Sequence, residues 1–218
     1  MAIAPTTSPP CFDESFKAQL RDLLLWRRDV RRFKRDALPA GALERLIESA
    51  CLAPSVGLSQ PWRFIIVDDT ALRGRILAEF ERCNADALKS YSGEVAARYA
   101  KLKLAGLVEA PAHLAVFADR STIVGRGLGR RTMPEMADYS VVAAVVTMWL
   151  AARAESIGMG WVSILDPERV AELLGVPADW RFIGYFCLGF PDDDSQVPEL
   201  ERAGWERRLD CHQHILRR

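Results

Sequence analysis

One stretch of this chain is too apolar to lie on a protein surface. Residues 139–152 carry no charged side chain, and a helix drawn through them is apolar on nearly every face until Arg153 and Glu155. A membrane span requires about 20 residues, and this stretch is shorter. We therefore expect a helix that is buried in a core or in a subunit interface, with the rest of the chain arranged around it.

The flanking sequence alternates between helical and extended patterns. Apolar residues recur at helical spacing in several segments, and short apolar runs lie between these segments. The predicted helices span about 15–26, 41–53, 70–88, 94–107 and 166–174, and the predicted strands span 62–67, 112–118, 161–165 and 180–188. This mixture predicts one α+β domain, with a mixed central sheet of about four or five strands around the buried helix.

Charge and cysteine content narrow the classes of function. The 29 basic and 29 acidic residues balance, which argues against a nucleic-acid partner. The five cysteines are scattered and form no Cys-x-x-Cys pair, so we expect reduced thiols in the cytoplasm. The first residues show no secretory signal, and the three histidines give no metal-ligand spacing. We expect no metal site and no membrane partner.

A basic cluster follows the first predicted helix. Residues 27–33, RRDVRRF, hold four arginines and one aspartate. The helix dipole favours cations at a C-terminal end, which explains Arg27 and Arg28 without a ligand. Forked guanidinium donors also match phosphate oxygens. Taken alone, the cluster is either a solvated charge run or a phosphate site with a built-in acid/base.

Residues 119–138 have no clear period and contain three alternating glycines at 125, 127 and 129. The spacing does not complete a dinucleotide-binding fingerprint, because no helix opens directly after the glycines. A long irregular segment inside a compact domain is more often a binding loop. We therefore predict a lid at about residues 120–138.

Four separated stretches together resemble the nitroreductase family of FMN proteins. Residues 27–33 resemble the family's RRSxRxF opening, and residues 53–62, APSVGLSQPW, resemble its second motif. Residues 158–161, GMGW, are similar to its glycine turn beside the flavin, and Arg207 and Arg208 lie where the family places a C-terminal phosphate contact. The resemblance runs from about residue 16 to residue 209. It implies a nitroreductase-like fold and a homodimer with the flavin at the subunit interface.

The resemblance also implies a set of FMN-binding residues. Arg27 and Arg31, with Arg207 or Arg208, would hold the phosphate. The full set that we carry over is Arg27, Arg28, Asp29, Val30, Arg31, Ser55, Gln60, Leu104, Gly160, Ser163, Arg207 and Arg208.

Departures from the family pattern point to one branch. Asp29 stands where most members have Ser or Thr, and Leu58 where many have Asn. The runs 129–135 and 160–167 are similar to those of the 5,6-dimethylbenzimidazole synthases. That branch consumes reduced FMN and O2 and yields the lower ligand of cobalamin and a sugar phosphate. The resemblance implies that Asp29 is a general acid/base and that Ser163 offers a hydroxyl to the flavin N5 region.

Two other functions remain open at this point. An NAD(P)H-dependent nitro- or flavin reductase would share the fold, and a non-catalytic FMN-binding protein would need neither Asp29 nor Ser163. In the synthase interpretation the closed lid leaves little room for a nicotinamide, so a separate flavin reductase would supply FMNH2. We expect a flexible arm at 1–12, a single FMN domain at 13–209 and a tail at 210–218.

Overall fold

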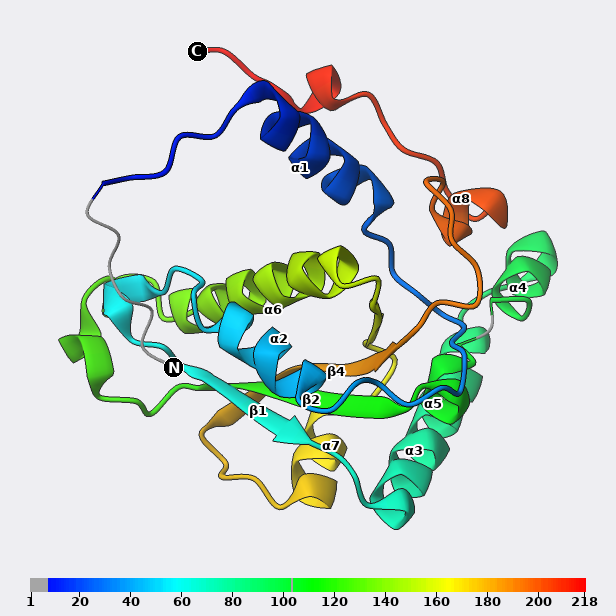
Figure 1. Cartoon of the computed structure of the whole chain (residues 1–218). Helices are drawn as coiled ribbons and strands as arrows, with labels where there is room; N and C mark the ends of the chain where they lie inside the picture. The colour runs from blue at the N-terminus through cyan, green and yellow to red at the C-terminus, as the bar shows by residue number, and fades with distance from the viewer. Residues whose placement is uncertain (1–7, 103) are drawn as a thin grey trace.

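Four strands form the central sheet (Figure 1). The structure, a computed structural model, describes residues 8–102 and 104–218, so the first seven residues of the predicted arm lie outside it. The strands follow the order β1 (Trp62–Ile66), β2 (Ala112–Asp119), β4 (Trp180–Gly189) and β3 (Gly158–Val162). All three neighbouring pairs are antiparallel. The prediction of a mixed sheet is therefore wrong. The parallel pairing in the described residues is an isolated bridge between Asp29 and Met159.

Alternation along the two central strands divides the core into two layers. In β2, Leu114 and Val116 face one hydrophobic cluster while Ala115 and Phe117 face the other. This follows from the strand geometry, which points successive side chains to opposite faces. Both faces of the sheet are therefore covered.

The first face carries the predicted buried helix. Helix α6 (Met136–Ala154) packs there beside α2 (Ala42–Ala50), and eight of its residues are buried. By length and composition α6 would also suit a membrane span, and 44% of that window is buried within the protein. Its place against the sheet confirms the prediction of a core helix.

The opposite face carries α3 (Thr70–Leu88), α5 (Gly106–Glu109) and α7 (Pro167–Leu174). Local chemistry sets where these helices begin. The carboxylate of Asp69 accepts the amides of Ala71 and Leu72, and Asp166 caps α7 ahead of a proline in its first turn.

Two predicted boundaries are wrong. The helix expected at 94–107 is split into α4 (Gly93–Tyr99) and α5, because the amide of Gly106 donates to the carbonyl of Arg31 at 3.0 Å. The strand expected at 161–165 is β3, three residues earlier. Its glycines are not a turn but strand residues that let the chain at Val30 approach: a Cβ on Gly160 would lie 2.1 Å from the Val30 oxygen.

Helix α1 (Glu14–Trp26) has no buried residue. The apolar face that its sequence predicts is present, but Phe16, Leu20 and Leu24 are 42%, 40% and 52% exposed. In Figure 1, α1 lies beyond α6, away from the sheet. The C-terminal part adds the one-turn helix α8 (Glu199–Arg202) and a 3-10 turn at Cys211–His214.

Candidate functional site

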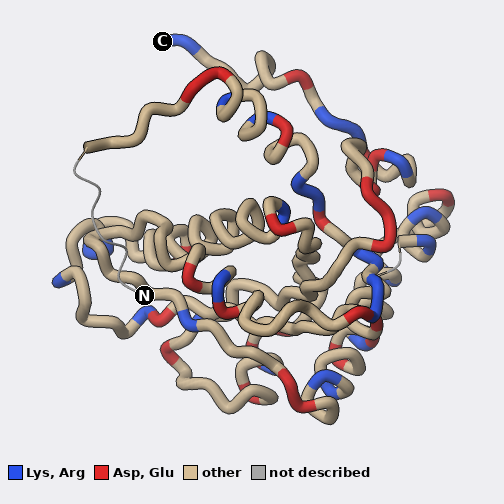
Figure 2. Tube along the Cα trace, viewed as in Figure 1, with Lys and Arg blue, Asp and Glu red and all other residues tan. Residues whose placement is uncertain are grey.

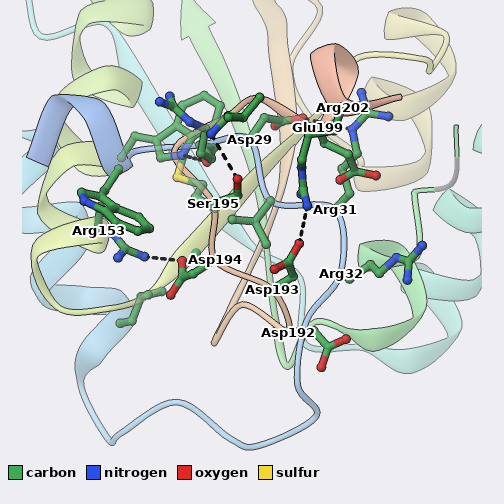
Figure 3. Close-up of a pocket in the computed structure, with 18 of the residues that line it drawn as sticks. Asp29, Arg31, Arg32, Arg153, Asp192, Asp193, Asp194, Ser195, Glu199 and Arg202 are labelled. Carbon is green, nitrogen blue, oxygen red and sulfur yellow. Dashed lines mark hydrogen bonds and ion pairs between the residues drawn. The ribbon is translucent and has the colours of Figure 1, made fainter. Parts of the chain in front are cut away.

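A cavity of about 360 Å³ lies at the C-terminal end of α6 (Figure 3). Three segments line it: the basic cluster after α1, the end of α6 with the start of β3, and the chain at 192–203. Arg28, Asp29, Val30 and Arg31 are among its residues. The cavity therefore brings together four of the residues predicted to bind FMN.

Asp29 is held in this cavity by the backbone of β3. Its Oδ1 accepts the amide of Trp161 at 2.8 Å, and its Oδ2 lies 3.7 Å from Nε of Arg31. Burial raises the pKa of Asp29, while the Trp161 amide and the charges of Arg31 and Arg27 oppose the rise. The side chain keeps 38% of its surface exposed. Such a carboxyl is fixed in place, remains open to the cavity and keeps its proton to higher pH than a free aspartate does.

Two arginines of the cluster have guanidinium donors to spare. Within the described residues, Arg27 makes no ion pair and stacks over the ring of Trp149 at 5.0 Å. The side chain of Arg31 is 12% exposed, and its ion-pair partner among the described residues is Asp29, at a long 3.7 Å. These donors are available to an oxyanion, as the predicted phosphate role requires.

Arg28 is occupied differently. Its guanidinium donates to the carbonyl oxygens of Gln196, Arg27 and Leu25. Burial, then the charges of Arg208 and Arg27, lower its pKa. Arg28 thus ties the end of α1 to the chain at 196, and the charge of Arg208 acts on Arg28. Arg207 and Arg208 themselves are exposed.

The acidic turn 192–194 also lines the cavity, a role that we did not predict from the sequence. Figure 2 shows these acidic residues bordering the basic residues that follow α1. Asp193 pairs with Arg202 at 2.7 Å and Asp194 pairs with Arg153 at 2.7 Å. The run of three aspartates was the available signal. It balances part of the positive charge around the cavity.

Three predicted contacts have packing roles in the structure. The amide of Val30 donates to Met159 at 3.1 Å, and Gly160 gives the room for that approach. Leu104 packs with Val30 against the second core cluster. Whether these residues also touch a flavin stays a prediction.

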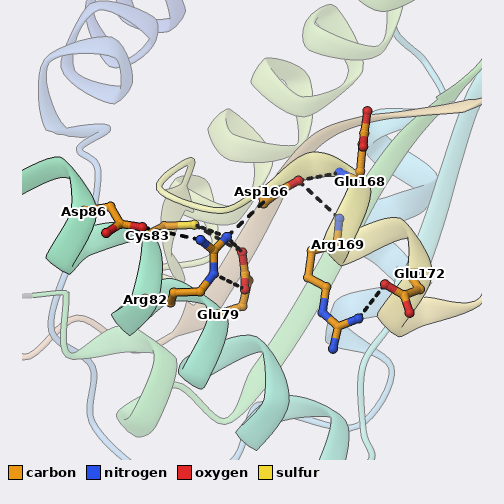
Figure 4. A network of polar contacts seen from close by, with 8 residues as sticks. All are labelled: Glu79, Arg82, Cys83, Asp86, Asp166, Glu168, Arg169 and Glu172. Carbon is orange, nitrogen blue, oxygen red and sulfur yellow. Dashed lines mark hydrogen bonds and ion pairs between the residues drawn. The ribbon is translucent and has the colours of Figure 1, made fainter.

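Ser163 lies outside the cavity of Asp29. It follows β3 and is exposed, where we expected it within the strand. It lines a larger cavity of about 1150 Å³ with Arg82, Cys83 and Trp180. Beside this cavity, Arg82 bridges the buried Glu79 and Asp166 (Figure 4). Asp29 and Ser163 are joined through β3 but open into different cavities of one protomer.

The loop with Ser55 and Gln60 is at the other end of α6. The amide of Val56 donates to Ser140 near the start of α6, whereas Trp149 near its end donates to the Arg28 carbonyl. Nine residues of α-helix separate these points by roughly 13 Å. The hydroxyl of Ser55 accepts the Gln60 amide at 3.1 Å, and Gln60 has a positive φ of 45°. Within one protomer, this loop and Asp29 do not form one site.

The predicted lid packs on that loop. A Cβ on Gly57 would meet the carbonyl oxygens of Gly125 and Leu128 at 3.1 Å, so the two segments are in close contact. Arg120 and Asp138 form an ion pair across the base of the segment. In the protomer, residues 120–138 therefore cover the 53–61 loop and not the arginine cluster.

Two other groups have little bearing on this cavity. His113 is 2% exposed and shares a 2.9 Å hydrogen bond with Tyr185, and burial lowers the pKa of His113 to about 4. It is a core histidine whose ring has a hydrogen-bond partner. Near the C-terminus, exposed ligand atoms of Asp210, Cys211 and His212 lie within 4.8 Å of one another.

Comparison with known proteins agrees with the motifs. The model of the Nitroreductase family matches residues 24–190. A 5,6-dimethylbenzimidazole synthase of Rhodospirillum rubrum is 54% identical over 199 residues, which cover 91% of this chain and 94% of the relative. One from Rhodobacter capsulatus is 46% identical, with 91% and 96% covered. A crystal structure of oxidized iodotyrosine deiodinase bound to FMN and 3-iodo-L-tyrosine superimposes with a TM-score of 0.69 at 30% identity, covering 81% of this chain and 91% of that one. This chain belongs to the nitroreductase family.

Proposed function

We propose that this protein fragments reduced FMN in the presence of O2 to give 5,6-dimethylbenzimidazole, the lower ligand of cobalamin, and a sugar phosphate. Relatives of that name match more than nine tenths of the chain at 54% and 46% identity. The observation that carries the proposal is Asp29, a carboxylate fixed by the Trp161 amide in the cavity that Arg28 and Arg31 also line. Most members of the family have a hydroxyl at this position.

The donors around the cavity suit a flavin phosphate. Arg27 and Arg31 keep guanidinium N–H groups without strong partners in the described residues, and Arg208 lies near Arg28. Guanidinium forks bind phosphate through paired, charge-assisted hydrogen bonds. We therefore assign Arg27, Arg31 and one of Arg207 and Arg208 to the phosphate. Arg28 positions the cluster through its backbone contacts.

Asp29 would hold and move a proton beside the flavin. Reduced FMN supplies the electrons that O2 accepts and the ring that is fragmented. Cleavage of carbon–carbon and carbon–nitrogen bonds requires several proton transfers. A carboxyl whose pKa is raised by burial can accept and return a proton, which a serine cannot do efficiently. Ser163 would offer its hydroxyl to the N5 region.

A second copy of the chain would complete the site. Asp29 and the Ser55 loop lie roughly 13 Å apart along α6, and the lid covers the loop. The apolar face of α1 is exposed, together with Tyr139 and Val146 of α6, which are 54% and 46% exposed. A homodimer would bury these apolar surfaces and bring one protomer's Ser55, Gln60 and lid to the other's Asp29.

The remaining proposals concern the supply of the flavin. With the lid closed over the ring, a nicotinamide would not reach it, so a separate flavin reductase would supply FMNH2. The reduced, unpaired cysteines suit a cytoplasmic enzyme.

One experiment tests the function. The protein is loaded with FMN, reduced by light without nicotinamide and then exposed to air, and the small molecules are separated and identified. We expect 5,6-dimethylbenzimidazole and a sugar phosphate. Recovery of intact FMN alone would refute the proposal, and it would indicate a non-catalytic FMN protein if NAD(P)H were also left unoxidised. Rapid NAD(P)H oxidation by the pure protein would indicate a reductase.

A further inference from the structure

The segment that carries Arg207 and Arg208 is exposed almost throughout. From residue 203 to residue 210, a stretch that the structure describes without a gap, Trp205 is the one residue that is not exposed. Helix α8, just before it, has no buried residue. The position of the two arginines therefore depends on what holds Trp205.

Trp205 lies against two tyrosines. Its ring centroid is 5.6 Å from that of Tyr91, at an interplanar angle of 88°, and 6.1 Å from that of Tyr99, at 57°. The two tyrosine rings are 4.9 Å apart. Edge-to-face contacts at these distances are favourable for aromatic rings. We call Tyr91, Tyr99 and Trp205 the aromatic clasp.

The clasp is fixed to the body of the protein. Tyr99 is 9% exposed and donates its hydroxyl to Asn84 of α3 at 2.9 Å. Arg98 of α4 donates to the carbonyl of Gly204 at 3.2 Å, and α4 lies beside α8 in Figure 1. The amide of Trp205 closes the turn after α8 by donating to Leu200 at 2.9 Å. Ring contacts and hydrogen bonds thus act on the same two residues, 204 and 205.

The clasp is also close to the arginine cluster. Arg207 and Arg208 follow Trp205 by two and three residues, so they lie within roughly 7–11 Å of it along the chain. Arg208 is near enough to Arg28 to affect its titration. On the other side, α4 leads into Gly106, whose amide donates to the carbonyl of Arg31. The clasp therefore joins two segments that both reach the cluster.

We propose that Trp205, held by Tyr91 and Tyr99, is the positioning residue that places Arg207 and Arg208 at the phosphate of the flavin. The proposal rests on the proposed function only for the ligand, FMN, and not for its fragmentation. In this proposal the aromatic clasp causes the protein to bind FMN more tightly than an unphosphorylated flavin. Riboflavin, which has the same ring and no phosphate, is the discriminating ligand.

The test is anaerobic titration calorimetry with FMN and with riboflavin. We expect Trp205→Leu to weaken FMN about tenfold and riboflavin less than twofold, and Trp205→Phe, which keeps an aromatic ring, to restore most of the FMN affinity. In an Arg207→Ala, Arg208→Ala background, Trp205→Leu should have no further effect on FMN. If Trp205→Leu does not fold, as judged by circular dichroism, Tyr91→Ala opens the clasp from its exposed side and carries the same expectations.

Two results would overturn the proposal. Equal weakening of FMN and riboflavin would mean that Trp205 supports the flavin site generally. An undiminished effect of Trp205→Leu without the two arginines would mean that it acts through other groups. Neither result depends on whether benzimidazole is formed, so failure of the synthase proposal is detected separately by product analysis.

Discussion

Replacing Gly160 by alanine should separate the backbone of β3 from the segment that carries Asp29. An ideal Cβ on Gly160 would lie 2.1 Å from the carbonyl oxygen of Val30, and real Cβ atoms essentially never come closer than 3.0 Å to such an atom. The Val30 carbonyl would have to move by at least 0.9 Å, the difference between these distances. The obstacle is backbone, so no side-chain rotation relieves it.

The movement would weaken two hydrogen bonds that hold the same segment. The first joins the Val30 amide to Met159 at 3.1 Å, and the second joins the Trp161 amide to the Asp29 carboxylate at 2.8 Å. Loss of a neutral hydrogen bond costs about 0.5–1.5 kcal/mol and loss of one to a charged group about 1.5–3 kcal/mol. We expect Gly160→Ala to lower the free energy of unfolding by roughly 2–4 kcal/mol. The melting temperature should fall by roughly 5–15 °C in a chain of this size.

Denaturant and thermal unfolding at matched protein concentration measure this effect. Gly74→Ala is the control, because nothing lies within 4 Å of a Cβ there and Gly74 is inside α3. We expect that substitution to be neutral or to stabilise by about 0.5–1 kcal/mol. A Gly160→Ala variant as stable as the Gly74→Ala variant would refute the proposed close approach of Val30 to β3.

Three further perturbations test charge and assembly. Asp29→Asn should still bind FMN and form no benzimidazole. Because burial raises the pKa of Asp29, the contribution of this carboxyl to stability is full at acid pH and is lost as pH rises. The variant should therefore be more stable than the parent protein at about pH 7, and this advantage should disappear below about pH 4. Glu79 has its pKa lowered to about 2 by hydrogen bonding to Arg82, so Glu79→Gln should lower the free energy of unfolding by about 1–3 kcal/mol at pH 7, and by progressively less as pH falls from 4.5 toward 2. Leu24→Glu on the apolar face of α1 should yield monomers that bind FMN weakly, whereas Arg21→Glu on the other face should leave the dimer intact. Light scattering measures the assembly, and a dimeric Leu24→Glu variant would exclude the apolar face of α1 from the interface.

The sequence predicted the elements whose signals are local. The all-apolar run at 139–152 located the core helix, and Asp69 and Asp166 with its following proline located the starts of α3 and α7. It misplaced β3, because glycines were taken as a turn. What those glycines accommodate is the segment at Val30, more than 120 residues earlier in the chain. Only the tertiary structure brings these two segments together.

The candidate site was predictable to a similar degree. The arginine motif picked out Arg28 and Arg31, which line the cavity, while the phosphate contact of Arg207 or Arg208 stays a prediction. The separate roles of its arginines could not be predicted from the sequence. Arg28 donates to the carbonyl of Gln196, which is distant in the chain. The sequence did not show whether burial, which raises the pKa of Asp29, outweighs the neighbouring arginines, which lower it. In the structure the effect of burial is the larger one.

The partner of Asp29 is a backbone amide, and this has an evolutionary consequence. Every residue except proline would present the same N–H at position 161, so the side chain there can vary without releasing the carboxylate. The Trp161 side chain, which packs beside Trp149 and Phe186, is correspondingly free to respond to selection on the packing around it. Substitutions at residue 161 should therefore change the packing around Asp29 while the Asp29 carboxylate stays in place.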